Sequence, residues 1–177
     1  ATAPIAEGLF TALVIGSDTR NENQFLGNSD TIVIAQLTPA RDRINLVSIA
    51  RDSYVDGSKI NAFYARGGPD RLQAVVSRLL VDLPIDATIE TTFERFIGGI
   101  ELLGGISVNN VHASDSMGPE YPAGVIQING EDALTYVRER KGLPLGDFDR
   151  TQRGRAALSG ILDKLHAIAV ADLSAFN

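Results

Sequence analysis

The sequence predicts an α/β fold: a single domain with a mixed β-sheet flanked by helices in an α/β/α arrangement. Short apolar runs bounded by turn residues, which are typical of buried strands, alternate with segments whose apolar residues recur at helical spacing. The chain has 177 residues, of which 44% are hydrophobic and 21% charged, and this is the balance of one globular domain. We therefore expect a single domain over residues 1–177.

Three early segments are predicted strands. FTALVIG (Phe10–Gly16) is a short apolar run that ends at glycine, which suits a buried central strand. TIVIAQLT (Thr31–Thr38) and INLVSIA (Ile44–Ala50) flank the turn-like PARDR, so these two segments are expected to form a β-hairpin.

Four later segments are predicted helices. Apolar residues recur at helical spacing after Pro69, which suits a first turn, and again from Phe93 to a stop at Gly104–Gly105. ISVNNV follows that stop as a strand. Gly130–Arg138 is expected to be a short helix, and a long helix is expected from Asp149 onward.

Composition and missing motifs exclude several function classes. The formal net charge of −6 argues against a nucleic-acid partner, because such domains usually carry a basic face. The absence of cysteine removes a thiol nucleophile and a cysteine zinc site. No P-loop or GxGxxG motif is present, and no run of about 18 apolar residues that could form a membrane span. If the full protein has an anchor or signal, we expect it to be absent from this sequence.

Two aspartates border the first two strands. Asp18 follows the first strand in GSDTR and Asp30 precedes the second in NSDT, so both carboxylates are expected at one sheet edge. Such a pair suits Mg²⁺, which binds one or two carboxylates and keeps waters that phosphate oxygens can replace. The alternative is that both are turn or cap residues, a frequent role of aspartate beside serine and glycine.

A charged dipeptide follows the third strand. Arg51 and Asp52 stand in a loop after Ile44–Ile49, and ligands of open α/β sheets collect outside strand ends. The alternative is a surface ion pair with little effect on stability.

The segment from residue 138 to 155 is basic in an acidic chain, with six basic and three acidic residues. Arg150 and Arg153 are three positions apart, so both project from one face of the predicted helix near its start. Helix N-termini attract anions, and two guanidinium groups there make a plausible pyrophosphate site. Arg138 and Arg140 could join it. Alternatively, nearby aspartates neutralise these arginines in a solvated cluster.

Seven motifs occur together in the order GSDTR, SDTIVI, VSIARDSYV, KINAFYARGG, FIGGIELLGGISV, INGEDALTYVRER and DFDRTQR. In this order the sequence resembles the LytR-CpsA-Psr (LCP) family, from about Thr11 to Leu165. PLGDFDR and the absence of a long insertion resemble actinobacterial members most.

The resemblance implies a phosphotransferase on the extracytoplasmic face of the membrane, held there by an N-terminal segment absent from this sequence. The enzyme would move a glycopolymer from a polyprenyl-pyrophosphate carrier to peptidoglycan. It also implies a Mg²⁺ site, with Mn²⁺ as an alternative ion, at Asp18 and Asp30. The arginines implied to bind pyrophosphate are Arg51, Arg138, Arg140, Arg150 and Arg153.

Among these residues, Arg51, Arg138 and Arg150 are assigned to catalysis together with Asp52, which would position or accept the proton of the attacking hydroxyl. The alternative for Asp52 is that it only orients Arg51. The account requires arginines and metal ligands from distant loops to meet at one lipid headgroup.

The resemblance further implies an apolar pocket for the polyprenyl tail. Its walls would come from two predicted helices, although a dry core needs the same side chains. The pocket residues are Leu72, Val76, Phe93, Phe96, Ile97 and Ile100.

The sequence departs from the family pattern at four positions. Ala50 replaces a common proline and Gly154 a common glutamine, while Asn28 and Arg66 stand where basic and apolar residues are frequent. Two alternative functions stay open, the first because it would use the same pyrophosphate site and the second because of Gly154. One is hydrolysis of the same pyrophosphate, and the other is binding of polyprenyl phosphate without catalysis.

Overall fold

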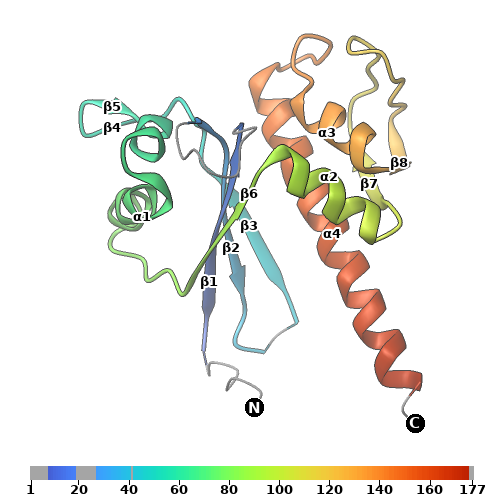
Figure 1. Ribbon diagram of the computed structural model, residues 1–177, viewed down its shortest axis with the longest axis horizontal. Helices are drawn as coiled ribbons and strands as arrows, with labels where there is room; N and C mark the ends of the chain where they lie inside the picture. The colour runs from blue at the N-terminus through green and yellow to red at the C-terminus, as the bar shows by residue number, and fades with distance from the viewer. Residues whose placement is uncertain (1–7, 19–26, 41, 176–177) are drawn as a thin grey trace. The chain divides into compact units, whose positions relative to one another are not determined.

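The computed structural model describes residues 8–18, 27–40 and 42–175, and the chain divides into two compact units. Unit 1 is Ala1–Phe93 and unit 2 is Glu94–Asn177. Figure 1 shows the order of strands and helices along the chain. The predicted α/β class and the mixed sheet are both confirmed.

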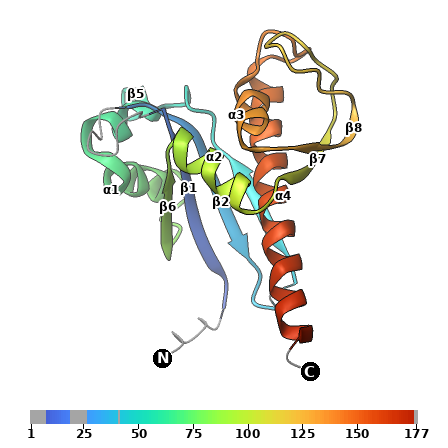
Figure 2. The same ribbon diagram turned by 45° about the vertical axis from the view of Figure 1, so that its right-hand side comes forward.

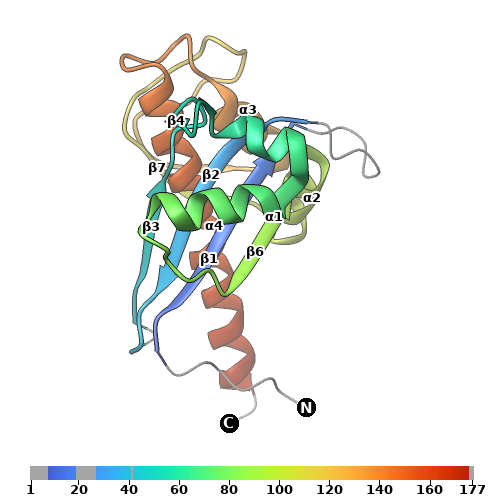
Figure 3. The ribbon, with the colours of Figure 1, turned by 90° about the vertical axis from the view of Figure 1, so that its left-hand side faces the viewer.

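Unit 1 is built on a four-stranded sheet in the order β3-β2-β1-β6. The central strand β1 pairs antiparallel with β2 and parallel with β6, which makes the sheet mixed (Figure 3). The predicted hairpin is the antiparallel pair β2–β3. A small separate hairpin, β4–β5, lies between β3 and α1 in the chain. The strand bounds are Phe10–Ser17 (β1), Ser29–Leu37 (β2), Ile44–Ser48 (β3), Tyr54–Val55 (β4), Ser58–Lys59 (β5) and Ala87–Thr91 (β6).

Helix α1 (Asn61–Leu79) crosses one face of this sheet and is broken in its middle (Figure 3). Gly67 and Gly68 have non-helical backbone angles, and Gly68 is left-handed with φ of 67°. Pro69 then starts the second segment, where its missing N–H costs no intrahelical bond. The predicted helix is that second segment, and the first segment was not predicted because Gly-Gly-Pro indicates a helix start.

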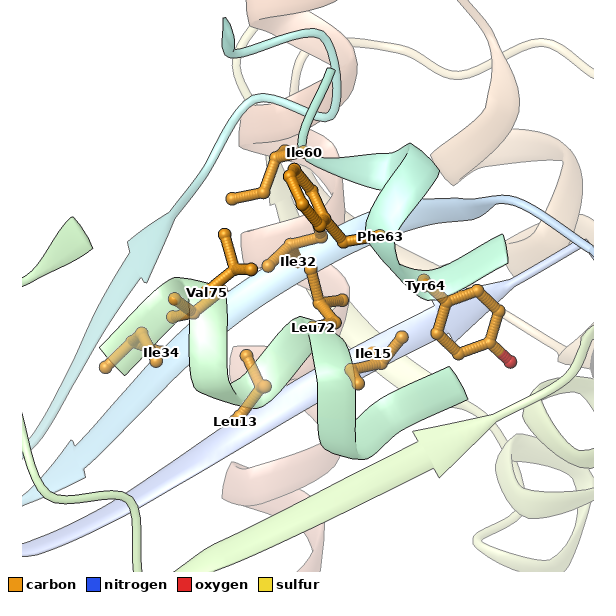
Figure 4. Packing of buried hydrophobic residues seen from close by; sticks show 10 residues of the cluster. Leu13, Ile15, Ile32, Ile34, Ile60, Phe63, Tyr64, Leu72 and Val75 are labelled. Carbon is orange, nitrogen blue, oxygen red and sulfur yellow. The ribbon is translucent and has the colours of Figure 1, made fainter. Parts of the chain in front are cut away.

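The core of unit 1 lies between α1 and the sheet. Figure 4 shows Leu72 and Val75 of α1 pointing at Leu13 and Ile15 of β1 and at neighbouring residues of β2. Burial of each such side chain contributes about 1.5–3 kcal/mol. Leu72 and Val76, predicted to line a lipid pocket, are both fully buried in this cluster. These two residues therefore fill a protein core, the alternative that the sequence left open.

Unit 2 combines a β-hairpin with helices. β7 pairs antiparallel with β8, and α4 packs along β7 and α3 (Figure 2). Gly160 allows this close approach, because a Cβ there would lie 2.5 Å from the carbonyl oxygen of Ser107. The bounds are Phe93–Leu102 (α2), Ile106–Asn110 (β7), Gly124–Ile128 (β8), Gly130–Arg138 (α3) and Asp147–Ala175 (α4).

The predicted helices of this half are confirmed, and α3 has the predicted bounds. The core of unit 2 includes Ile100, Ile106, Val108 and Tyr136. Within the described part of the chain, no helix, α4 included, has the length and apolar character that a bilayer span requires.

Candidate functional site

Asp18 and Asp30 lie at the same end of the antiparallel β1–β2 pair. Gly16 is opposite Thr31 and Ser17 is opposite Ser29, so Asp30 is an extra residue that interrupts the ladder. Such a β-bulge redirects a side chain and often occurs near functional sites. The expected placement of both aspartates at one sheet edge thus follows from strand pairing within unit 1.

Asp30 holds the arginine that follows β3. Arg51 lies in a turn, where the N–H of Ser53 donates to the carbonyl of Ala50, and its Nη1 donates to Asp30 Oδ1. Both side chains are partly buried. The bulge at Asp30 and the turn after β3 therefore fix a guanidinium group at the sheet edge.

Asp18 makes local backbone contacts. Its Oδ1 accepts a 2.7 Å hydrogen bond from the N–H of Asn28, and its own N–H donates to the Asn28 carbonyl. This geometry matches the turn role considered for Asp18 and leaves the second carboxylate oxygen outside that bond.

The donor chemistry of Asp18 and Asp30 fits Mg²⁺, which needs only one or two carboxylates when waters or phosphate oxygens complete its shell. Across residues 8–18, 27–40 and 42–175, no group of three or more potential ligand residues gathers for a metal ion. These two carboxylates would therefore bind a cation only together with water or substrate.

Asp52 is paired with Lys59, whose Nζ lies 2.7 Å from Asp52 Oδ1. Asp52 Oδ2 lies farther from Arg51, at 3.8 Å from its Nε. The Asp52 side chain is 49% exposed. Asp52 is thus paired with a lysine and only partly covered by protein.

Arg153 lies inside unit 2. Its Nη1 donates to Glu139 Oε2 at 2.6 Å, and its Nη2 donates to Ser114 Oγ, the His112 carbonyl and Asn110 Oδ1 at 2.7, 2.9 and 3.2 Å. The guanidinium carbon is also 4.4 Å from the Tyr136 ring centroid, a cation–π distance. Arg153 is 3% exposed, so protein groups surround the charge that we assigned to pyrophosphate.

Glu139 is the partner that sequence reasoning missed, and it is fully buried. Burial alone would raise the pKa of this carboxyl, but hydrogen bonds from Ser114, Ser116 and Arg153 outweigh it and lower the pKa. Its Oε1 accepts from both the hydroxyl and the N–H of Ser116, at 2.6 and 3.0 Å. The only sequence signal was an acidic residue between two arginines. We call Glu139 and Arg153 the buried ion pair.

A tyrosine pair completes the surroundings of the buried ion pair. Tyr121 and Tyr136 pack edge to face, with centroids 5.3 Å apart. Burial raises the pKa of both phenols, to about 12 for Tyr121, where Asp132 and Glu139 add to the effect. Both rings therefore stay neutral beside Arg153 at physiological pH.

Three further arginines are close in the sequence to one or other member of the buried ion pair. Arg138 and Arg140 directly flank Glu139, and both are exposed. Arg150 is in the first turns of α4, three residues before Arg153, and its Nη2 is 2.7 Å from Asp147 Oδ1. Because Arg153 ties α4 to the end of α3, the buried ion pair holds these three arginines at one end of unit 2.

The predicted site residues thus form two groups. Asp18, Asp30, Arg51 and Asp52 belong to unit 1, while the other arginines belong to unit 2. In unit 1, Arg51 contacts Asp30 and lies 3.8 Å from Asp52, whereas Asp18 contacts Asn28. In unit 2, Arg153 pairs with Glu139 and Arg150 with Asp147. The meeting of the two groups at one lipid headgroup stays a prediction.

The remaining lipid-pocket residues lie on α2. Ile100 is buried in the core of unit 2, and Phe96 packs partly against that core. Phe93, Phe96 and Ile97 keep partial exposure, so they are the pocket candidates that core packing does not cover fully.

The sequence model of the LytR_cpsA_psr family matches residues 3–173 and so spans both units. The chain belongs to the LytR-CpsA-Psr family. TagU of Bacillus subtilis (strain 168), a polyisoprenyl-teichoic acid–peptidoglycan teichoic acid transferase, is 35% identical to this LCP chain over 161 residues. The match covers 88% of this chain and 52% of TagU.

Solved structures share the fold of this LCP chain. Lin1025 from Listeria innocua is 36% identical with a TM-score of 0.75, and the match covers 89% of this chain and 65% of Lin1025. TagT bound to LIIa-WTA is 29% identical with a TM-score of 0.77, over 89% of this chain and 64% of TagT. The chain thus spans about half the length of the curated relatives it matches. TagU proteins at similar identity come from Bacillus species, and Lin1025 comes from Listeria, so the relatives give no support to the predicted actinobacterial source.

Proposed function

We propose that this LCP domain transfers a glycopolymer of the teichoic acid class from a polyprenyl-pyrophosphate carrier to peptidoglycan. The names of its relatives support the reaction class, and the TagT complex supports a lipid-linked substrate. The reaction would occur at the extracytoplasmic face of the membrane, with the domain anchored by a segment outside this sequence.

The observation that carries the proposal is the arrangement of arginines around the buried ion pair. Arg138 and Arg140 emerge on either side of an immobilised Glu139, and Arg150 is one turn from Arg153. A diphosphate diester carries two negative charges, and guanidinium groups bind phosphate oxygens in paired hydrogen bonds. These three arginines are suited to hold the diphosphate, while Arg153 acts as a positioning residue.

Unit 1 would contribute Arg51 and the two aspartates. Arg51, fixed by Asp30, supplies one more guanidinium group for phosphate oxygens. Asp18 and Asp30 would hold Mg²⁺, or Mn²⁺ in its place, which when bound neutralises charge on the diphosphate.

In the proposed reaction a hydroxyl of the acceptor sugar attacks the phosphorus that bears the glycopolymer. The new P–O bond joins polymer phosphate to acceptor, the bond to the bridging oxygen breaks, and polyprenyl phosphate leaves with that oxygen. Arginines fixed before the reaction stabilise the oxygens of the transferring phosphoryl group, so no covalent enzyme intermediate is needed. Asp52 remains the candidate acceptor for the hydroxyl proton.

The direct test incubates the domain with a polyprenyl-pyrophosphate-linked oligosaccharide, Mg²⁺ and peptidoglycan. We expect polymer joined to peptidoglycan, loss of turnover on chelation, and a fall of about 100-fold or more for Arg150→Ala. Arg155→Ala on the same helix is the matched control and should keep turnover. Polymer phosphate released equally with and without peptidoglycan would identify a hydrolase instead. Lipid binding without metal-dependent turnover would refute catalysis.

A further inference from the structure

The segment from the end of α3 into the first turn of α4 presents large apolar side chains beside cations. Phe148 is 81% exposed and Leu145 is 65% exposed, while Arg140 and Lys141 are exposed a few residues earlier. We propose that residues 140–148, here called the docking loop, bind the surface of an anionic lipid bilayer. Leu145 and Phe148 would enter the interface, and Arg140 and Lys141 would contact lipid phosphates.

The docking loop has a fixed conformation that turns these side chains outward. The N–H of Leu143 donates to the Arg140 carbonyl, the N–H of Gly146 donates to the Leu143 carbonyl, and Asp149 Oδ2 accepts the N–H of Leu145 at 2.8 Å. Leu143 is buried and anchors the middle of the loop. The loop therefore buries one leucine and exposes the next, and the exposure of Leu145 is a property of its fold.

The loop between β7 and β8, which contains Ser116 and Met117, restricts the docking loop further. A Cβ at Gly142 would lie 2.7 Å from Ser116 Oγ and 2.9 Å from Glu139 Oε1, so only glycine fits without a shift. Figure 1 shows both loops at the same end of unit 2, the docking loop in orange. Met117, which follows Ser116, is also exposed and adds apolar area at this end.

Single exposed apolar residues are common on protein surfaces and do not by themselves indicate a binding site. The charges beside each one decide whether it could approach an anionic bilayer. Val81 is followed by Asp82 and Leu102 is preceded by Glu101, and phosphate headgroups would repel both acids. At the docking loop, by contrast, Glu139 is buried against Arg153 and Asp147 is paired with Arg150.

The remaining charge of the docking loop is therefore positive. Phe148 and Leu145 could enter the apolar part of the bilayer interface, while the exposed cations beside them contact lipid phosphates. This combination is typical of segments that bind anionic bilayers. Asp115 and Glu120 are exposed on the neighbouring loop, so the attraction is local, and we expect weak, salt-sensitive binding. The proposal does not depend on the proposed reaction, because it concerns lipid binding alone.

The chain contains no tryptophan, so Phe148→Trp creates a single fluorescent reporter in the docking loop. We expect its emission to shift to shorter wavelength with vesicles of phosphatidylglycerol and phosphatidylcholine, and to be quenched by lipids with brominated chains. The control is Leu102→Trp, which is at least as exposed as Phe148 but lies beside Glu101, and its emission should not change. An unchanged Phe148→Trp spectrum, or the same shift in both variants, would overturn the proposal.

Vesicle sedimentation tests the side chains separately. Phe148→Ser should lower the fraction of bound protein about tenfold, and Leu145→Ser by a similar factor, since each removes a large apolar side chain from the interface. Lys141→Glu should lower the fraction of bound protein and make binding less sensitive to salt concentration. The control Leu102→Ser should bind as the parent chain does. All of these positions are on the surface, so circular dichroism should show an unchanged fold. Equal binding by all variants would contradict the assignment.

Discussion

At the residue scale, Glu139 organises the basic end of unit 2. Two charges are removed from water, and the cost is offset by the ion pair and by hydrogen bonds from Ser114 and Ser116. These bonds hold the backbone at Glu139, and in the proposed site Arg138 and Arg140 extend from that held backbone.

Glu139→Gln should destabilise the domain. The substitution keeps the shape of the side chain but leaves the buried guanidinium of Arg153 without its counter-charge, so we expect a loss of about 3 kcal/mol in the free energy of unfolding. Urea denaturation measures it. Glu131→Gln, at an exposed glutamate on α3, the helix that ends just before Glu139, is the control and should change stability by less than about 0.5 kcal/mol. Equal effects at both positions would contradict the role of the buried ion pair.

The lowered pKa of Glu139 also predicts a dependence of stability on pH. A carboxyl whose pKa is lower in the folded state than its ordinary 4.5 stabilises the fold above that ordinary value. This contribution is lost as pH falls below 4.5 toward the folded pKa. We therefore expect the thermal midpoint of the parent chain to fall more steeply with acid than that of Glu139→Gln. Parallel curves for the two proteins would refute this.

At the element scale, strong local signals were readable and weak ones were not. The apolar periodicity of α2 and α4 predicted those helices, and α3 was predicted as a short helix with the bounds that the structure has. β8 was missed because most of its side chains are exposed, so its sequence lacks a buried run. β6 was missed for a similar reason, as a short edge strand with polar threonine and glutamate residues.

The candidate site likewise contains features that the sequence predicts and features that it does not. Asp18 and Asp30 could be placed at one edge, because strand ends determine it. The burial of Arg153 could not be predicted: spacing puts it on the face of Arg150, but its partner Glu139 is 14 residues away and in another element. The spacing of residues in one helix predicts which side chains share a face of that helix. It does not predict which other element packs against that face.

Helix α4 tests a departure from the family pattern. Gly154 lies inside the helix, and a Cβ there would meet open space. Gly154→Gln should therefore stabilise the fold by about 0.8 kcal/mol through helix propensity, measured by thermal unfolding. Gly160→Ala on the same helix is the control and should destabilise, because its Cβ would clash with the Ser107 carbonyl. Destabilisation by Gly154→Gln would show that the glycine has a structural role.

At the scale of the whole molecule, each unit supplies a set of charges that its own fold fixes. Unit 1 holds Arg51 through the bulge at Asp30, and unit 2 holds Arg150 near the buried ion pair. The family match spans both units, and the proposed reaction needs both sets of charges on one diphosphate. That shared action is the central claim.

A double-mutant cycle on Arg51→Ala and Arg150→Ala, read as kcat/KM for transfer, tests this claim most directly. We expect each single variant to lose about 100-fold or more, and the double variant to depart from the product of the single losses by about 1 kcal/mol or more, because both groups act on the same transition state. Arg155→Ala combined with Arg51→Ala gives the additive reference. Independent losses for Arg51 and Arg150, or full activity in either single variant, would contradict a shared site.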